Sequence, residues 1–318
     1  MMTNAQNFSV INFDDTKEML SYLDELQHEK ADAVFRGHSR AEWQLIPSAW
    51  RSGGIIEKRK DDLLREFGNQ LLHMLPTDLS NACLTQNQFQ GDGEERLTEL
   101  VAWLCAEEQA VDEFCSLCDS VALPVPGFSA PIAPRLFKSS STGNVPAQDY
   151  GSEVAFAQHF GIPTRFLDFT ENALKALYFA ASGVSHGGLL QLSQPAFAVV
   201  VAWPQLADLE EYFGVHGDSV RVRRFLRSEI PRLHAQDGLF LICNERANSW
   251  FLETGTWPSF DLVTKNWMFE VVTAPAELAM DAVSRLRRKG IYEVRMKPSY
   301  ETAAAEFRAS KSGNLGLG

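Results

Sequence analysis

The second half of the chain alternates short strand-like runs with helix-like segments, and this alternation limits the folds open to it. Runs rich in β-branched and aromatic residues lie at 188–192, 197–203, 239–243, 269–273 and 291–297. Apolar residues recur at helical spacing over 152–160, 168–182 and 275–288. Elements that alternate in this way are typical of a sheet covered by helices. We therefore predict an α+β fold in which helices flank a mixed sheet.

The N-terminal residues add a strand, a helix and a second strand to this pattern. FSVINF is strand-like, TKEMLSYLDELQ places Met19, Leu20 and Leu23 at helical spacing, and ADAVFRG favours β structure. Arg36 stands at the end of this last run and is followed by Gly37. Because glycine lets the backbone come close to a ligand, we predict that Arg36 projects into a binding site.

Residues 55–147 differ from the rest of the chain, and we predict that they form a helical insertion. Helical periodicity in KRKDDLLREFGNQLLHML and EERLTELVAWLCAEEQAVDEFCSLC gives way to a tail rich in proline, serine and glycine. The segment has 7 basic and 14 acidic residues, and such a run is usually a solvated face. The predicted organisation is an α/β domain of residues 1–54 and 148–300, the acidic insertion with its Pro/Ser-rich loop, and a C-terminal helix and tail at 301–318.

The charge balance limits what the general surface of the chain can bind. Its 29 basic and 41 acidic residues leave a formal net charge of -12, which argues against unspecific adhesion to nucleic acid or to an anionic membrane. An anionic ligand must therefore be met by a local basic site. The apolar runs, such as FAVVVAW, are far shorter than the roughly 20 residues that span a bilayer, so we predict no membrane anchor.

The cysteines favour a reducing compartment. Their number, 5, is odd, and no charged and apolar leader pattern opens the sequence, so we predict a cytoplasmic protein. Cys115 and Cys118 lie in a helical pattern without two further ligands at zinc spacing. We therefore predict that these cysteines are structural and that the chain has no metal site.

Most of the polar chemistry of the second half gathers in QHFGIPTRFLDFT, residues 158–170. Gly161 and Pro163 are the usual signals that stop a helix. Asp168 and Glu171 have the spacing of a capping box at the start of the next helix. Helix punctuation therefore explains these four residues.

Four other residues of the same stretch are not needed for punctuation: Gln158, His159, Thr164 and Arg165. The start of a helix carries free N–H groups and a partial positive charge, and Arg165 adds a donor fork that suits phosphate or carboxylate. We predict that they hold one anion. Two alternatives stay open: His159 can instead pack in the core, and Arg165 can pair structurally with Asp168.

A second polar cluster surrounds the strand that ends near Arg36, in VFRGHSRAEWQLIPSAWR. Read together, the two clusters resemble the FRG domain family, whose signature is an F/Y-R-G tripeptide, then W-x-L-x-P-S-x-x-R, and later Q-H-x-G-x-P-T-R-L-L-D-W-T. The matching blocks are Phe35-Arg36-Gly37, WQLIPSAWR from Trp43 to Arg51, QHFGIPTRFLDFT from Gln158 to Thr170, and the further family-like piece AQDGLF from Ala235 to Phe240. Phe166 and Phe169 depart from the typical Leu and Trp, which changes packing and leaves the polar residues in place.

The resemblance implies a biological setting more than a reaction. FRG domains are mostly uncharacterised and occur widely in bacteria and phages, so a role in phage defence or conflict is implied. The resemblance covers roughly residues 15–300 and does not extend to the helical insertion.

The first candidate function is that of an NAD-dependent enzyme similar to ADP-ribosyltransferases. An aromatic-Arg-Gly motif on an early strand is similar to the first motif of many such enzymes, in which the arginine grips the dinucleotide; Arg36 takes that role here. The other residues assigned to cofactor binding are Gly37, Trp43, Arg51, Gln158, Thr164, Arg165 and Tyr178. Gln236 is the candidate for the late catalytic residue, although an amide supplies no negative charge to a cationic transition state. Glu153 is a substitute for it.

Two alternatives belong to other classes. In a nuclease or phosphodiesterase, His159 acts as general acid or base while Arg36 and Arg165 neutralise the phosphate. In a non-catalytic module that binds a nucleotide or nucleic acid, the anion-binding face is RVRRFLRSEIPR, with Arg221, Arg223, Arg224, Arg227 and Arg232. That arginine-rich run can equally pair with the acidic insertion. In every case we expect a nucleotide or NAD as ligand, with a protein or nucleic acid as the further target of an enzyme.

Overall fold

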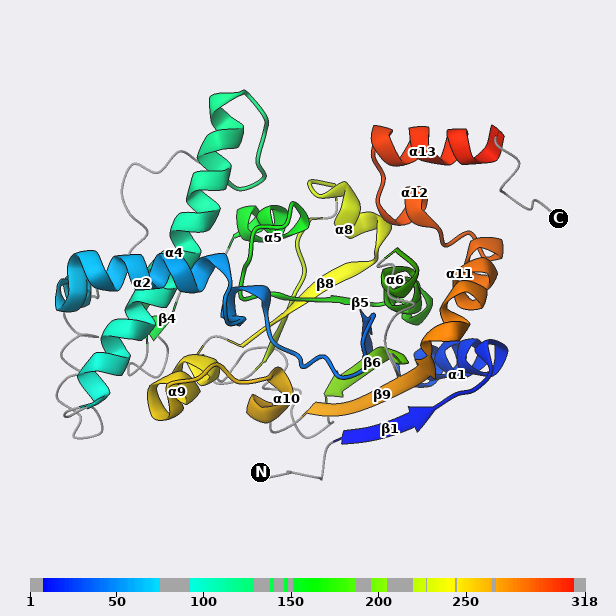
Figure 1. Cartoon of the computed structure of the whole chain (residues 1–318), viewed down its shortest axis with the longest axis horizontal. Helices are drawn as coiled ribbons and strands as arrows, with labels where there is room; N and C mark the ends of the chain where they lie inside the picture. The colour runs from blue at the N-terminus through cyan, green and yellow to red at the C-terminus, as the bar shows by residue number, and fades with distance from the viewer. Residues whose placement is uncertain are drawn as a thin grey trace.

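The computed structural model describes residues 8–74, 92–128, 138–139, 146–147, 151–186, 196–204, 220–226, 228–243, 245–264 and 267–311. Its centre is a seven-stranded mixed sheet in the order β1-β9-β6-β2-β5-β8-β7 (Figure 1). The strands are β1 (Phe8–Asn12), β2 (Val34–His38), β5 (Leu167–Thr170), β6 (Ala196–Pro204), β7 (Arg221–Arg223), β8 (Gly238–Ile242) and β9 (Trp267–Pro275). The β1–β9 pair is parallel and the other described pairs of this sheet are antiparallel. The predicted α+β class with a mixed sheet is confirmed.

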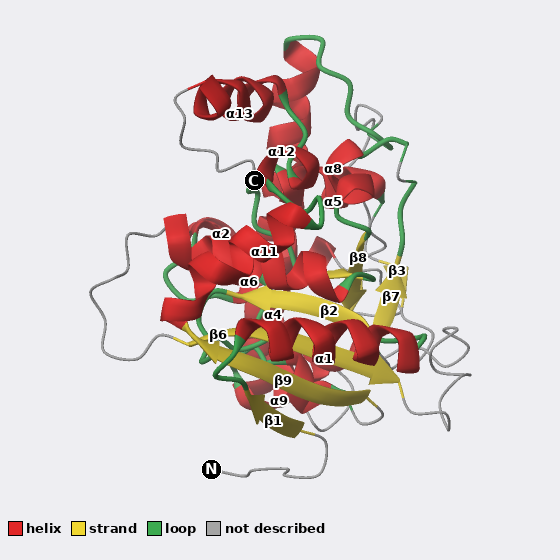
Figure 2. Ribbon diagram, turned by 90° about the vertical axis from the view of Figure 1, so that its right-hand side faces the viewer, coloured by secondary structure: helices red, strands yellow, loops and turns green. Residues whose placement is uncertain are grey.

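Helices cover both faces of this sheet, and the pleat of β6 shows how the chain builds two cores. Phe197, Val199 and Val201 pack with α1 (Thr16–Glu29), α6 (Ala173–His186) and α11 (Ala279–Arg288). The alternate residues Ala198, Val200 and Ala202 pack with the helices of the opposite face. Those helices are α2 (Ile55–Phe67), α4 (Asp92–Ser120), α9 (Glu245–Thr254) and α10 (Phe260–Val263). Alternate residues of a strand point to opposite faces, so one apolar strand serves both cores; α1 crosses in front of the strands in Figure 2.

The remaining elements are short or peripheral. They are η1 (Ser48–Trp50), η2 (Gly68–Met74), β3 (Lys138–Ser139), β4 (Pro146–Ala147), α5 (Ser152–His159), α8 (Pro231–Ala235), η5 (Ala276–Leu278), α12 (Glu293–Met296) and α13 (Tyr300–Lys311). None of the helices in the described part of the chain is long and apolar enough to cross a membrane.

Residues 158–170, which we call the joint, begin at the end of α5. The helix end predicted in the joint is confirmed. α5 ends at His159, and Gly161 has a positive φ of 87°. The amide of Ile162 donates to the carbonyl of Ala157 at 3.2 Å, and that of Gly161 donates to the carbonyl of Gln158 at 3.0 Å. This is the Schellman arrangement, in which glycine takes the left-handed position without a Cβ penalty.

The predicted capping box is wrong, because Asp168 lies in a strand. Leu167 and Phe169 are buried on either side of the exposed Asp168 in β5, and helix α6 begins only at Ala173. The cap is Asn172, whose side-chain oxygen accepts from the amide of Lys175 at 3.0 Å. The buried alternation of β5 and its pairing with β8 therefore override the local helix signal.

The other predicted elements have mixed outcomes. The strands at 197–203, 239–243 and 269–273 are confirmed as β6, β8 and β9, and the helix at 275–288 as η5 and α11. The strand predicted at 291–297 is wrong: the segment forms the short helix α12, and its Met296 is buried with the α6 and α11 residues of one core. The strand predicted at 188–192 lies outside the described residues.

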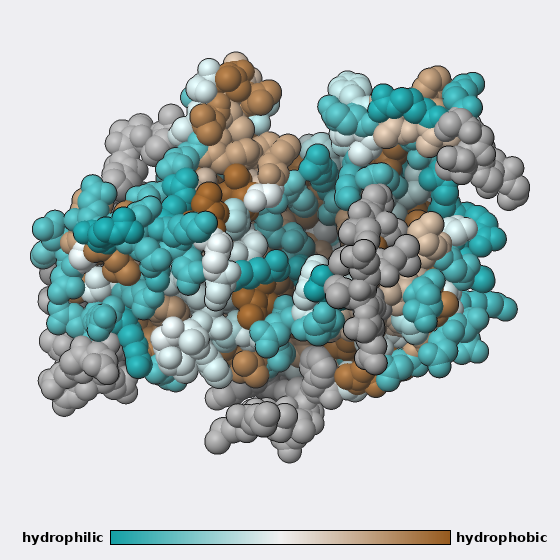
Figure 3. Space-filling view, viewed as in Figure 1, coloured by the Kyte–Doolittle hydropathy of each residue, from teal (hydrophilic) through white to brown (hydrophobic). Residues whose placement is uncertain are grey.

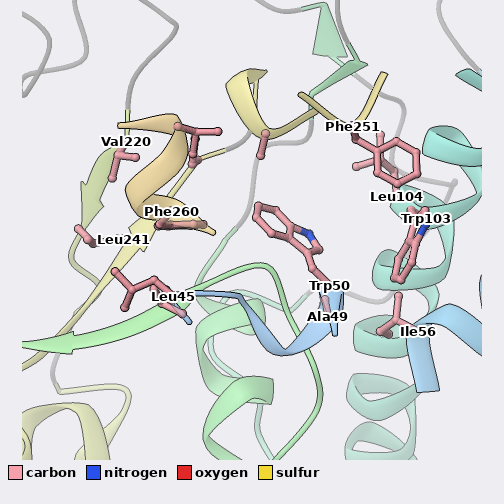
Figure 4. Close-up of a cluster of buried hydrophobic side chains, with 14 of the residues drawn as sticks. Leu45, Ala49, Trp50, Ile56, Trp103, Leu104, Val220, Leu241, Phe251 and Phe260 are labelled. Carbon is pink, nitrogen blue, oxygen red and sulfur yellow. The ribbon is translucent and has the colours of Figure 1, made fainter. Parts of the chain in front are cut away.

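The helices predicted as an insertion share a core with the sheet. α4 contributes Leu97, Leu100 and Trp103 to the same apolar cluster as β6 and β9, so α2 and α4 are part of the main body of the fold. In Figure 4 the indole of Trp50 lies between Phe260 and Trp103. The division of the chain at residues 55 and 147 stays a prediction.

One buried ion pair joins α4 to the joint. Arg165 and Glu107 have side chains 1% and 4% exposed, and two nitrogens of the guanidinium donate to the two carboxylate oxygens at 2.7 and 3.0 Å. The third nitrogen donates to the side-chain oxygen of Asn248 on α9 at 3.2 Å. The rings of Trp50 and Trp257 lie 5.7 Å from the guanidinium carbon. Glu107 is therefore an exception in the acidic run, whose residues Glu94, Glu95, Glu113 and Asp119 are exposed.

The C-terminal end of α4 also exposes apolar side chains. Leu117, Val121 and Leu123 are 68%, 66% and 58% exposed. They account for hydrophobic surface at the upper end of this helix in Figure 3. This surface is separate from the residues discussed below as a site.

We predict that Glu107→Gln lowers the free energy of unfolding by about 3 to 5 kcal/mol, because it leaves the charge of Arg165 buried and unpaired. Urea unfolding measures this change. The matched control is Glu113→Gln on the same helix, which removes an exposed carboxylate that is paired in a bidentate way with the partly exposed Arg59. The control should cost less than about 1 kcal/mol, and equal losses in the two variants would contradict the prediction.

We predict that Gly37→Ala costs about 3 kcal/mol or more of stability. A Cβ at this position meets the carbonyl oxygen of Ala176 at 2.1 Å and the amide nitrogen of Ala180 at 2.7 Å, and these backbone atoms of α6 cannot rotate away. Thermal unfolding provides the measurement. Gly161→Ala is the comparison. Its Cβ meets nothing within 4 Å, so the positive φ alone costs about 1 kcal/mol of stability. A smaller loss for Gly37→Ala than for Gly161→Ala would show that α6 can move off the strand.

Candidate functional site

A cavity of about 300 Å³ opens among β2, β5, α5, α6 and the turn after α8. Figure 1 shows α5 and α8 beside β5 and β8. The described residues that line it are Phe35, Arg36, Gly37, Gln158, His159, Asp168, Phe169, Thr170, Ala176, Phe179 and Gln236. The structure thus brings together the F-R-G tripeptide, the joint and the Gln236 turn, which are far apart in the sequence.

Arg36 is the cation of the cavity, and three atoms hold its guanidinium. Nε donates to Nε2 of His38 at 3.1 Å, Nη1 donates to the backbone oxygen of Asp168 at 2.6 Å, and Nη1 lies 3.7 Å from the Asp168 carboxylate. Burial lowers the pKa of Arg36, Asp168 opposes this shift, and the charge of Arg51 adds to it. The guanidinium stays charged at neutral pH. Among the described residues, no acceptor is bonded to Nη2, which leaves that end available to a ligand.

His38 is a neutral imidazole that holds Arg36 in place. Its side chain is 2% exposed, and burial lowers the pKa of His38 to about 3, with the charges of Arg36 and Arg51 acting in the same direction. Because Nε2 accepts from Arg36, the ring proton belongs on Nδ1. His38 belongs to the second polar cluster of the sequence, but only the structure shows that it orients the arginine.

Asp168 places a carboxylate in the cavity. Its side chain is 51% exposed, while its strand neighbours Leu167 and Phe169 are 1% and 4% exposed. The alternation of β5 therefore turns this one side chain outward. The sequence signal that points to Asp168 is the period-two pattern of LDFT, which the apparent capping box masks.

His159 contributes a second imidazole. Burial lowers the pKa of His159, while the carboxylate of Asp168 opposes the shift and the charge of Arg232 adds to it. Its Nε2 atom is buried and has no hydrogen-bond partner among the described residues. Arg232 donates to the backbone oxygen of His159 at 2.9 Å, which anchors α8 to the end of α5. His159 is thus a neutral group that lines the cavity, and its unbonded Nε2 is buried.

Thr164 supports the cavity wall from behind. It is 2% exposed and its hydroxyl donates to the side-chain oxygen of Gln158, so the amide nitrogen of Gln158 is left as the donor. The backbone N–H of Thr164 donates to the hydroxyl oxygen of Ser48 at 3.2 Å. The amide of Ala49 donates to the Thr164 carbonyl at 3.1 Å. These two hydrogen bonds hold the W-x-L-x-P-S block against the joint.

Gln236 completes the wall opposite the joint. Its side-chain nitrogen donates to the carbonyl of Met296 at 3.0 Å. Its backbone oxygen accepts from the hydroxyl of Thr170 at 2.6 Å, and Asp237 follows with a positive φ of 48°. The amide is thus held by α12, the segment that replaces the predicted strand at 291–297.

Arg165 and Tyr178 do not line the cavity. The anion contact predicted for Arg165 is replaced by the buried pair with Glu107, because the side chain points into the core under α4. Tyr178 is 2% exposed and packs in the core between α6 and the sheet, so it is not placed to stack on a ligand. The alternative pairing of Arg165 with Asp168 is also not what the structure shows.

Trp43 and Arg51 lie near the cavity without lining it. Trp43 is 50% exposed, and its ring centre is 6.0 Å from that of His38. Arg51 is exposed and donates to the carbonyl of Ile46 at 3.2 and 3.3 Å. Its charge still reaches Arg36 and His38, since it contributes to both of their lowered pKa values.

In the described part of the arginine-rich run, Arg223 and Arg224 are exposed, and the anion-binding face stays a prediction. Arg224 pairs with Glu171 at 3.0 Å, and Arg232 is bonded to His159. Arg227 lies outside the described residues.

Cys115 is buried, and no group of metal-ligating side chains was found among the described residues.

We predict that His38 makes the protein less stable as the pH falls below 6.5. The folded form keeps a neutral His38 with a pKa of about 3, whereas the unfolded chain takes up the proton near pH 6.5. Each pH unit in between removes up to about 1.4 kcal/mol of stability.

Urea unfolding at pH 7 and pH 5 tests this. His38→Gln keeps an acceptor for Arg36 without a titrating ring, so its loss over this range should be about 2 kcal/mol smaller than that of the wild type. Equal losses would mean that His38 is already protonated in the folded protein.

Comparison with known proteins gives one match. No curated protein and no solved structure showed a significant similarity. Residues 132–187 match the family model of the FRG domain. This range includes α5, β5 and α6. Gln158 and His159 lie on α5, and Asp168 lies on β5. The chain therefore carries a segment that matches the FRG domain, and this segment supplies one wall of the cavity.

Proposed function

We propose that the cavity binds a nucleotide, with NAD as the first candidate, and that the protein acts as an ADP-ribosyltransferase-like enzyme. The observation that carries this proposal is the position of Arg36, whose guanidinium is fixed on the cavity wall by His38 and Asp168. A preorganised arginine fork with one free end suits a phosphate oxygen. The side-chain amides of Gln158 and Gln236 add polar groups that orient a sugar.

The size of the cavity decides how much of NAD it holds. At about 300 Å³ it lies at the lower end of the range for small-molecule sites. One nucleotide half fits inside, and the other half then lies over the rim. The exposed ring of Trp43 and the exposed charge of Arg51 are close to His38 and Arg36 and offer stacking and a second phosphate contact there.

We also propose a wider role for the protein. The FRG resemblance supports an effector in bacterial or phage conflict that modifies a protein or nucleic acid. The cytoplasm is the compartment we propose, in keeping with the odd number of cysteines in the sequence.

A second candidate function, phosphodiester hydrolysis, rests on His159. The side chain of His159, whose buried Nε2 has no partner among the described residues, lines the same cavity as Arg36. A neutral imidazole accepts a proton from an attacking hydroxyl or water, and the arginine neutralises charge on the phosphorus oxygens. This reaction requires no NAD, so the two candidates are separable.

We predict that Arg36→Ala lowers the affinity for NAD at least about tenfold, because it removes a charge-assisted contact to phosphate. Isothermal titration calorimetry measures the affinity, and Arg36→Lys should restore it only in part since an ammonium lacks the fork. The matched control is Arg224→Ala, which removes a paired arginine outside the cavity and should bind NAD as the wild type does.

An unchanged NAD affinity in Arg36→Ala would overturn the proposed function. Release of nucleotides from RNA or DNA by the wild type, lost in His159→Gln and accompanied by no NAD binding, would establish the second candidate in its place. Incubation with labelled NAD and cell extract then identifies the modified macromolecule if the first candidate holds.

A further inference from the structure

The cavity presents two opposite charges side by side. Arg36 and Asp168 both line it, and Nη1 of the arginine is 3.7 Å from the carboxylate. Their side chains are 17% and 51% exposed, so the carboxylate is the more accessible of the two. The strand β5 holds Asp168 in place, because Leu167 and Phe169 on either side of it are buried.

This pairing penalises a ligand that carries negative charge alone. An anion that binds Arg36 comes to lie beside the Asp168 carboxylate, and like charges at such distances repel. It also takes over the cation that otherwise balances Asp168. A ligand with an anionic group for Arg36 and a cationic group for Asp168 leaves neither charge uncompensated in the complex.

The surroundings of Asp168 do not supply that second cation. The imidazole of His159 is near enough for Asp168 to oppose its pKa shift, but burial favours the neutral ring. Lys175 is bound to Asp237 at 2.6 Å, and Arg224 is bound to Glu171. Among the described cations, Arg36 is the one within ion-pair distance of Asp168. Phe179 lines the same cavity, and an aromatic ring is a favourable neighbour for a flat cation.

We propose that Asp168 selects a ligand that carries a cation, so that the cavity takes the oxidised, pyridinium form of a nicotinamide nucleotide in preference to its reduced form. This inference rests on the proposed function, because it assigns the nicotinamide half of NAD to the same cavity. The two forms have the same phosphates and riboses and differ in the charge of one ring, so their comparison isolates the contribution of the carboxylate.

Asp168 also supplies the negative charge that the amide of Gln236 lacks in the proposed reaction. The bond between ribose C1′ and the pyridinium nitrogen breaks, and its electron pair leaves with neutral nicotinamide. Positive charge that develops at C1′ is stabilised by the carboxylate of Asp168. The acceptor's nucleophile then bonds to C1′ and loses its proton to water.

The test compares oxidised and reduced NAD by calorimetry with the full chain. The wild type should bind the oxidised form about five- to tenfold more tightly, a modest ratio because the half-exposed carboxylate is screened by water. Asp168→Asn should bind both forms with similar affinity, and Asp168→Glu should retain the preference. The matched control is Glu171→Gln, which removes an arginine-paired carboxylate that does not line the cavity and should leave the ratio unchanged.

The outcomes separate this inference from the proposed function. If the wild type binds both forms equally, or if Asp168→Asn keeps the preference, the inference is wrong while NAD binding stands. If the wild type binds neither form, the proposed function itself is wrong. The thermal unfolding midpoint of Asp168→Asn should match that of the wild type, since the side chain is half exposed. Asp168→Glu is the second variant, in which the ratio of the affinities for oxidised and reduced NAD is measured even if Asp168→Asn is unstable.

Discussion

The contact between Gly37 and α6 is the constraint on which the site depends. β2 is the middle strand of the sheet, and at Gly37 there is no room for a Cβ beside the α6 backbone. The helix therefore lies directly on the strand, and Ala176 and Phe179 come next to Arg36 in the cavity wall. The glycine of the F-R-G tripeptide thus acts through packing, and the arginine before it acts through charge.

The joint between α5 and α6 serves the core and the cavity at once. Arg165 turns inward to Glu107 and ties α4 to the sheet, while Gln158, His159 and Asp168 face the cavity. Thr164 links the two sides, since it is buried and orients Gln158. A rigid core contact thereby stands directly behind the polar groups, which is the support that a preorganised site needs.

Several features of the site follow from sequence patterns alone, and others do not. Arg36, His159, Gln158 and Gln236 were predicted and all line one cavity. The D-x-x-E spacing indicates a helix cap at Asp168 because it is a local signal, whereas the true setting of Asp168 depends on pairing with β8. The sequence around Arg165 suggests an anion contact, because no spacing rule reveals that Glu107 lies opposite this side chain across the core.

The sequence by itself determined the α+β class, the Schellman end of α5, the FRG resemblance and the segments that carry the polar residues, because periodicity, helix stops and motifs are local. Only the tertiary structure decided which of those residues face the cavity and which face the core. That choice depends on contacts between segments more than fifty residues apart, such as Arg165 with Glu107 and Arg36 with Asp168. A guanidinium has the same composition in both places, and its surroundings alone make one of them structural and the other available to a ligand.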